Sequence, residues 1–363
     1  MLKTAPAVFA VNNNYQIMVQ TRRTCLFSVK VNGKMYYDES NGIMRSASEI
    51  HRVAVPLKEL DKARSYTVII RPVVRRLPYF TLTAPVKEYT FSFRPVPECN
   101  IKAYHISDAH NMTKEPISAA GVFGKIDLLI LNGDVISHSG NPKKFDNIYK
   151  ICSELTKGGI PVIFSRGNHD MRGKYAEQFA EYTPNDQGNT YYSFRLGGLW
   201  GIVLDCGEDK SDDHEEYGFT VACHDFRIRQ TEFLKAQAKQ IPKDAYRRLV
   251  IAHNPFTQIF EPPFDIEKEL YGKWTKILRE EIMPHLMLCG HTHELTVRMP
   301  GDELDHQGQP CPVITGAYIG KKYFAGCGYI FGENETKVIF TDSKGRILQE
   351  HRVTGVIRTR PKA

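Results

Sequence analysis

Beyond residue 100, short apolar runs alternate with segments of helical period. The apolar runs predict buried strands at 101–106, 127–131, 160–164, 199–204, 249–252 and 286–288. Apolar residues recur every three or four positions over 143–155, which predicts a helix, and similar patterns predict helices at 228–238 and 266–282. This alternation indicates an α/β body with a central sheet. Short strand patterns after Thr296 complete the same domain.

Residues 8–95 show a different pattern, in which strand signals follow one another with turns between them. Asn32-Gly33 is a strong two-residue hairpin signal. About seven short strands without a helical period predict a small β-sandwich. The segment from Leu60 to Tyr66 resembles the leucine-to-tyrosine corner of fibronectin type III-like sandwiches. Because Pro95-Val96-Pro97 is a stiff linker, we expect two domains, a fibronectin type III-like sandwich at 1–97 and the α/β body at 98–363.

Composition and charge narrow the class of protein. The chain has 363 residues, of which 42% are apolar and 25% charged, as in soluble globular proteins. Its net charge of +7 is uneven, because residues 1–98 hold 15 Lys and Arg against 7 Asp and Glu. A basic module of this kind can face phosphates or an anionic surface, or can simply be a solvated polar face.

The chain shows no sign of export or membrane insertion. No apolar core of a secretory signal follows Met1, and no apolar run reaches the length of a membrane span. The eight cysteines are scattered without a Cys-x-x-Cys pair. We therefore expect a cytoplasmic protein with mostly reduced cysteines, although their even number leaves disulfides open.

Five of the predicted strands end in Asp, Asn or His. Any one of these residues could be a turn or cap residue, but ligands bind at the carboxyl ends of strands in open α/β sheets. The strand ends read Asp108-Ala109-His110, Gly133-Asp134, Gly167-Asn168-His169-Asp170, His253-Asn254 and Gly290-His291-Thr292-His293. Imidazole, carboxylate and amide ligands without thiolate suit Mn, Fe or Zn in a site that is not structural zinc. So many ligands suit two ions that share a bridging carboxylate.

This order of motifs resembles the calcineurin-like metallophosphoesterase family, whose fold is a β-sandwich flanked by helices. The resemblance implies two divalent metal ions and hydrolysis of phosphoric esters by a metal-activated hydroxide. It further implies that His169 lies over the substrate and that Asp170 orients it. One metal would be held by Asp108, His110 and His293, the other by Asn168, His253 and His291, with Asp134 bridging them.

The substrate class stays open at this point. We expect a phosphatase acting on a phosphorylated small molecule, with Arg166 contacting phosphate or lying at the surface. The alternatives are a phosphodiesterase for nucleotide-like or lipid-headgroup diesters and a catalytically silent binding module. A nuclease is a weaker idea, because an acidic loop at 208–216 would discourage nucleic acid. The sequence leaves the oligomeric state open.

A β-sandwich ahead of such a body also resembles the layout of purple acid phosphatases. In those enzymes the second motif continues to a metal-binding tyrosine shortly after Gly-Asp. Here Gly133-Asp134 is followed by Val135-Ile136-Ser137-His138, and no tyrosine occurs until Tyr149. We therefore expect Mn, Fe(II) or Zn rather than a ferric–tyrosinate site.

Overall fold

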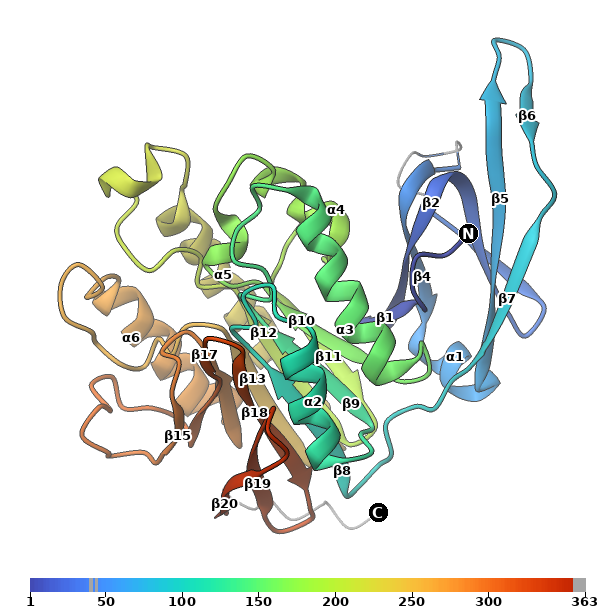
Figure 1. The fold of residues 1–363 in the computed structure, drawn as a ribbon. Coiled ribbons are helices and arrows are strands. Elements are labelled where there is room, and N and C mark those ends of the chain that lie inside the picture. The colour runs from blue at the N-terminus through green and yellow to red at the C-terminus, as the bar shows by residue number, and fades with distance from the viewer. Residues whose placement is uncertain (39–41, 43–44, 355–363) are drawn as a thin grey trace.

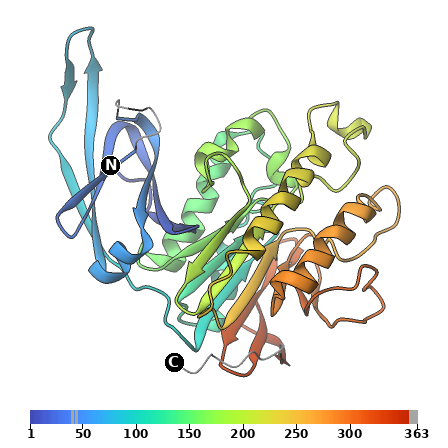
Figure 2. The same cartoon turned by 180° about the vertical axis from the view of Figure 1, so that it is seen from behind.

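The computed structural model describes residues 1–38, 42 and 45–354. Two β-sheets face each other, and helices cover the outer faces of both (Figures 1 and 2). This confirms the predicted α/β body with a β-sandwich flanked by helices.

The larger sheet has 14 strands, and its main path runs β20-β19-β18-β8-β9-β10-β1-β2-β5-β6. Strands β8, β9 and β10 are parallel, so their carboxyl ends share one edge. The strands of this sheet are β1 (Ala7–Val11), β2 (Asn14–Val31), β3 (Lys34–Tyr37), β4 (Ala47–Pro56), β5 (Ser65–Arg76), β6 (Thr81–Thr83), β7 (Lys87–Ser92), β8 (Ile101–Ile106), β9 (Leu128–Asn132), β10 (Val162–Ser165), β17 (Tyr318–Gly320), β18 (Tyr323–Phe331), β19 (Thr336–Asp342) and β20 (Ile347–Val353).

The smaller sheet has six strands in the order β11-β12-β13-β14-β16-β15. Strands β12, β13, β14 and β16 are parallel, so this sheet also gathers its carboxyl ends at one edge. Its strands are β11 (Tyr192–Leu196), β12 (Leu199–Leu204), β13 (Arg247–Ala252), β14 (Leu286–Cys289), β15 (Leu295–Arg298) and β16 (Val313–Gly316).

The helices pack on the outer faces of the two sheets. The helix predicted at 143–155 is α3, and the helix predicted at 266–282 is α6 followed by a π-helical turn at Leu278–Ile282. Helix α2 escaped prediction, because Pro116 and Gly121 interrupt a weakly periodic segment. The helices are α1 (Leu57–Ala63), α2 (Lys114–Phe123), α3 (Asp146–Thr156), α4 (Phe179–Tyr182), α5 (Cys223–Ala238) and α6 (Lys268–Ile277).

The central strands are buried on both faces, which explains their continuous apolar runs. In β9, Leu128 and Ile130 join the core between the sheets, whereas Leu129 and Leu131 join the core beneath the outer helices. The strand period of two sends successive side chains to opposite sides. A third apolar layer lies between the smaller sheet and α5 and α6. These layers fix the strand ends that carry the polar motifs.

The N-terminal region is all-β apart from α1, and it is joined to the body by β1. Phe9 of β1 pairs with Val162 of β10 in parallel, and β1 also pairs antiparallel with β2. The Asn32-Gly33 hairpin is confirmed, because Val31 pairs with Lys34 across two left-handed residues. The core between the two sheets contains residues from both regions, so the regions share one apolar interior.

The segment that suggested a fibronectin type III-like corner has a different local structure. Leu60 is buried on α1, and Tyr66 lies at the start of β5. The Tyr66 hydroxyl donates a hydrogen bond of 2.8 Å to the carbonyl of Gly158, which follows α3 in the chain. Tyr66 therefore ties the N-terminal strands to the body.

The eight cysteines are all free, and only Cys99 is exposed. Within the described part of the chain, no helix is long and apolar enough to cross a membrane.

The shared interior predicts that the described chain unfolds as one unit. The core beneath the outer helices also contains residues of both regions, among them Phe9, which is fully buried and packs edge-on against Phe164 at 6.2 Å between centroids. We expect Phe9→Ala to lower the free energy of unfolding by about 3–5 kcal/mol, measured by urea titration followed by circular dichroism. Ile347→Ala, at an exposed position, serves as the control and should cost less than about 0.5 kcal/mol. Two separate transitions, with only one shifted by Phe9→Ala, would contradict a shared interior.

Candidate metal centre

The five polar motifs lie together where the carboxyl ends of both sheets meet. Three follow β8, β9 and β10 of the larger sheet, and two follow β13 and β14 of the smaller sheet. Asn132, the last residue of β9, links the sheets at this point. Its side-chain amide donates to the carbonyls of Ala252 and Leu288, at 3.4 and 3.0 Å. The junction thus has a fixed geometry that does not depend on the longer loops.

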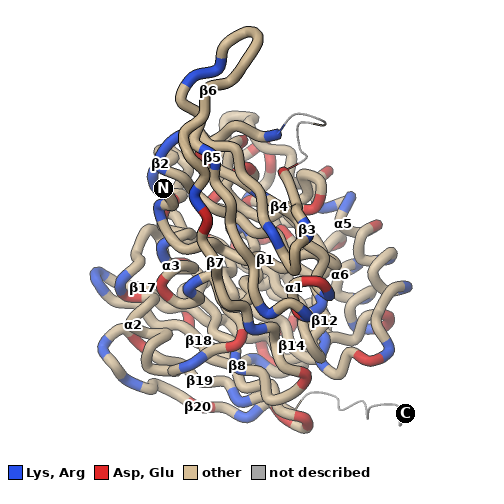
Figure 3. The backbone as a smooth tube through the Cα atoms, turned by 90° about the vertical axis from the view of Figure 1, so that its right-hand side faces the viewer, with Lys and Arg blue, Asp and Glu red and all other residues tan. Residues whose placement is uncertain are grey.

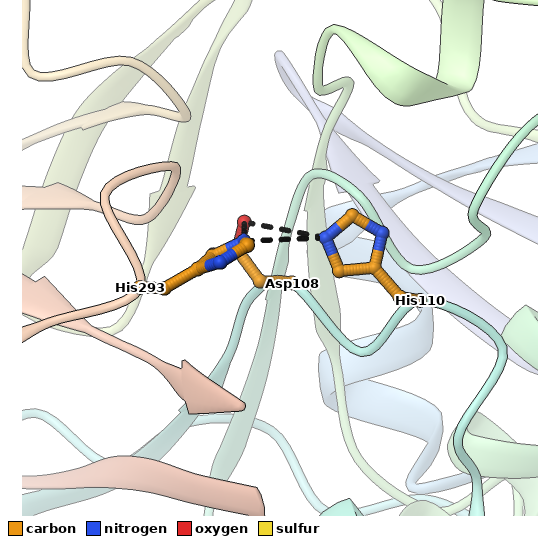
Figure 4. A group of neighbouring side chains, drawn as sticks. All are labelled: Asp108, His110 and His293. Atoms are coloured by element: carbon orange, nitrogen blue, oxygen red, sulfur yellow. Dashed lines mark hydrogen bonds and ion pairs between the residues drawn. The ribbon is translucent and has the colours of Figure 1, made fainter. Parts of the chain in front are cut away.

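The first cluster contains Asp108, His110 and His293 (Figure 4). The Nε2 atoms of the two histidines are 3.3 Å apart, and His293 Nε2 lies 3.3 Å from an Asp108 carboxylate oxygen. The hydrogen bond to Asp108 raises the pKa of His293. One carboxylate and two imidazoles therefore point at a common centre.

A second cluster joins Asp108, Asp134 and His253. His253 Nε2 lies 3.2 Å from an Asp134 oxygen and 3.7 Å from an Asp108 oxygen. Its other nitrogen, Nδ1, donates to the Asn132 carbonyl at 2.8 Å, which directs Nε2 at the two carboxylates. His110 Nε2 is 3.9 Å from the same Asp134 carboxylate. Asp134 therefore lies between the two groups of histidines.

Asn168 and His291 complete this side of the centre. The Asn168 Oδ1 atom lies 3.2 Å from His291 Nδ1. In this orientation the Asn168 side-chain oxygen faces only hydrogen-bond acceptors, namely Asp134 and His291. A cation bound between these three groups would satisfy all of them. With the amide turned over, its nitrogen donates to Asp134 and His291 and its oxygen accepts from Arg172. In either orientation the Asn168 amide places a polar atom 3.2–3.3 Å from His291 and Asp134.

His169 and Asp170 are held differently from what the resemblance implied. His169 Nδ1 donates to the Ser137 carbonyl at 3.0 Å, so a carbonyl fixes the ring. The Asp170 carboxylate instead accepts from the backbone N–H groups of Gly167 and Asp134, at 2.9 and 3.1 Å. Burial and repulsion by Asp134 raise the pKa of Asp170 to about 8. Asp170 thus binds the backbone of the motif rather than the imidazole.

The backbone of the site is unusual. Five of the motif residues have positive φ, a region that non-glycine residues seldom occupy. They are Asp108, His110, Asp134, His291 and His293, with φ between 42° and 71°. Such strain concentrates at functional sites, where surrounding structure holds it in place. The glycines allow the close packing, because a Cβ on Gly133 would lie 2.6 Å or less from the His253 ring.

The residues present fit bound cations. Asp108 and Asp134 are 0% and 1% exposed, and two buried carboxylates this close need positive charge nearby. Burial disfavours a charged His253, yet Asp134 and Asp108 raise its pKa to about 10. Burial likewise opposes ionisation of Asp108, but His253 and His293 hold the pKa of Asp108 below its usual range. Although His253 Nε2 lies 3.2 Å from the Asp134 carboxylate, it makes no hydrogen bond of good geometry with any described residue, which leaves this buried nitrogen facing the centre. The two carboxylates therefore favour positive charge at this position, as a bound cation would supply.

The family model for calcineurin-like phosphoesterases matches residues 101–295, which include all five motifs and more than half of the chain. The chain belongs to the calcineurin-like phosphoesterase family. It is accordingly an enzyme that hydrolyses phosphoric esters, and its Asp and His clusters have the ligand atoms to hold divalent metal ions. A comparison with curated protein sequences gave no match.

The fold of this phosphoesterase is similar to those of solved phosphatase structures. The purple acid phosphatase PPD1 from yellow lupin (Lupinus luteus) seeds matches with a TM-score of 0.59 and 14% identity. That match covers 97% of this chain and 74% of the lupin chain. A dimetal phosphatase from Danio rerio matches with a TM-score of 0.48 and 13% identity, over 71% of this chain and 99% of the other. The lupin likeness extends over the N-terminal strands as well as the family region, and it concerns the fold alone.

Arg166 lies beside the centre but is already paired. Its Nε donates to the buried Asp205 carboxylate at 2.7 Å, and its guanidinium stacks over Phe226. Arg172, which the motifs did not single out, lies closer to the ligands, with Nη2 3.3 Å from the Asn168 amide. It forms a two-pronged ion pair with Glu208 at 2.7–3.2 Å. Sequence offered one signal for Arg172, its position two residues after the third motif.

The acidic loop at 208–216 is not an open acidic rim. Arg172 pairs with Glu208, Asp209 and Glu216, and Lys210 pairs with Asp209 and Glu216. Asp209 also lies 3.8 Å from His291 Nε2. Two cations therefore offset part of the repulsion that these acids would exert on anionic substrates.

Asp134 lies between the two groups of histidines, so its loss should affect all metal bound at the site. We expect Asp134→Asn to weaken Mn²⁺ binding by more than the roughly 10–100-fold that loss of an outer ligand partner costs. The amide retains the acceptor for the His169 N–H, so circular dichroism should not change. The measurement is metal content by mass spectrometry after refilling the stripped protein. Asp213→Asn, on the exposed loop, is the matched control. Unchanged metal content in Asp134→Asn would exclude Asp134 as a ligand.

Proposed function

We propose that this phosphoesterase is a phosphatase that uses two divalent metal ions. Asp108, His110 and His293 hold one ion, and Asn168, His253 and His291 hold the other. Asp134 bridges them. The observation that carries this assignment is the convergence of two carboxylates, one amide and four imidazoles from the ends of five strands. All ligand atoms in this proposal are oxygen or nitrogen, which suits Mn, Fe(II) or Zn.

The bound ions supply charge neutralisation for the phosphoryl oxygens and lower the pKa of water at the site. The chain's own residues supply positioning and a proton. His169 donates its Nδ1–H to Ser137, which fixes the tautomer and leaves Nε2 as the atom that can exchange a proton. We assign His169 to stabilising the transferred phosphoryl group or protonating the leaving oxygen. Asp170 acts through the backbone of Gly167 and Asp134, which it holds in place.

In this proposal the leaving group of the substrate occupies a cavity of about 710 Å³ next to the third motif. The cavity is lined by four cationic side chains, three carboxylates and two aromatic rings; these are Arg166, Arg172, Lys174, Arg229, Glu177, Glu208, Glu216, Tyr217 and Phe226. Arg229 also stacks on Phe226, at 5.6 Å from the ring centroid. The lining has one cation more than it has carboxylates, which suits a phosphorylated small molecule. In this proposal Arg166 contacts phosphate with the part of its guanidinium that Asp205 leaves free.

The proposal also divides the chain into two domains. We assign residues 1–97 to a β-sandwich domain of fibronectin type III type and residues 98–363 to the catalytic domain. Strand β1 would then be a segment of the first domain that adds to the sheet of the second.

The assay compares an aryl phosphate monoester with the matching diester, on protein that is metal-stripped and refilled with Mn²⁺. We expect preferential turnover of the monoester. His169→Ala should reduce kcat by about 10²–10⁴-fold without loss of bound Mn²⁺, and His351→Ala on β20 is the control. A preference for the diester would favour the alternative, a phosphodiesterase for nucleotide-like or lipid-headgroup diesters. No turnover of either ester with Mn²⁺ bound would favour a silent binding module.

A further inference from the structure

The most prominent feature outside the metal centre is the hairpin of β5 and β6. It projects beyond the rest of the N-terminal strands (Figures 1 and 3). Arg75 pairs with Leu82 and Arg76 with Thr81, and the Leu77 N–H donates to the Phe80 carbonyl at 2.9 Å. Leu77 to Phe80 therefore form a closed turn at the end of a paired stem.

The turn and its stem present apolar side chains to solvent. Tyr79 is 99% exposed and Phe80 62% exposed, with Val74 at 57% and Leu82 at 50%. Large apolar residues seldom gather in the open on a monomeric protein unless they contact a partner or a membrane. No other described segment holds so many exposed large apolar residues within ten positions.

Cations follow directly behind this apolar tip. Arg75 and Arg76 occupy the first two pairs of the stem, and Arg71 lies further down the same strand. Residues 62–87 contain no Asp or Glu. Among the described residues, none of these three arginines forms an ion pair, so their charge is not neutralised within the chain. In Figure 3 the basic stretch lies next to β6, just below the tip.

An aromatic tip above a cationic stem is complementary to an anionic lipid bilayer. Tyr and Phe favour the interface between lipid headgroups and acyl chains. Arginines just outside that depth pair with anionic headgroups. A second copy of this chain fits less well, because a two-fold contact between hairpins would place arginine against arginine with no acid in the segment. Charge complementarity thus selects the bilayer.

We propose that the tip at residues 77–80, with Arg71, Arg75 and Arg76, docks the enzyme on anionic membrane surfaces. In Figures 1 and 2 the tip points towards the same end of the molecule as the loops after β10 and β12. Docking would therefore turn the loops around the metal centre towards the membrane surface. This function is independent of the ester that the enzyme hydrolyses.

The test is co-sedimentation of the full chain with phosphatidylcholine vesicles, with and without phosphatidylserine. We expect binding only to vesicles with phosphatidylserine, and weaker binding at high salt. Arg75→Gln with Arg76→Gln should weaken binding by roughly tenfold or more, because each arginine near the surface contributes a factor of about five. Tyr79→Ser with Phe80→Ser should weaken it at least as much. Phe80→Trp should show a fluorescence blue shift with the same vesicles.

Matched controls separate the hairpin from general surface effects. Lys235→Gln with Lys239→Gln removes the same charge from the C-terminal end of α5 and the residue that follows it, and Ile347→Ser removes an exposed apolar side chain from β20. Both should bind as the wild type does. Turnover of a soluble aryl phosphate should be unchanged in all hairpin variants, which shows that they are folded. Absence of wild-type binding, or equal binding by the hairpin variants, would overturn the proposal. So would self-association that Tyr79→Ser with Phe80→Ser abolishes while vesicle binding is absent.

Discussion

The site depends on the burial of two carboxylates that repel each other. Asp108 and Asp134 follow adjacent parallel strands, and both are almost completely removed from water. Burial of charge without compensation is too costly to persist. Within the chain, that compensation comes from His253 and His293, which lie within 3.2–3.3 Å of the carboxylates. The clustering of imidazoles around buried carboxylates is the physical reason to expect cations there.

The two sheets make this arrangement possible. The carboxylates come from the larger sheet and His253, His291 and His293 from the smaller one, so the site exists only where both sheets meet. Asn132 holds that junction by hydrogen bonds to strands β13 and β14. Left-handed backbone at several ligand positions persists because packed strands on both sides hold it. The apolar layers thus maintain a local geometry that the motif peptides would not adopt alone.

Much of the body could be predicted from the sequence, because apolar runs and helical periods are local signals. Strands β8 and β12 have the predicted bounds, and the strand ends carrying the motifs were placed correctly. The pairing of β1 with β10 was not predictable, because Phe9 and Val162 are far apart in the chain and register is a tertiary property. The side chains around the ligands were also missed. The signal for Arg172 was only its position two residues after the third motif, and its contact with Glu208 depends on how two loops meet.

The contacts of Asp170 also could not be predicted from the sequence. The family resemblance implied that Asp170 orients the ring of His169, its neighbour in the motif. Its carboxylate instead turns to the backbone of Gly167 and Asp134, and the carbonyl of Ser137, from another loop, takes the imidazole. Adjacency in a motif predicts proximity but not which atoms form the hydrogen bond.

The most direct test of the central claim is anomalous X-ray diffraction from crystals of the Mn²⁺-loaded enzyme. The account predicts two anomalous peaks about 3.5–4 Å apart on either side of the Asp134 carboxylate. One peak should lie against Asp108, His110 and His293, the other against Asn168, His253 and His291. A single peak, or peaks away from Asp134, would contradict the two-metal assignment.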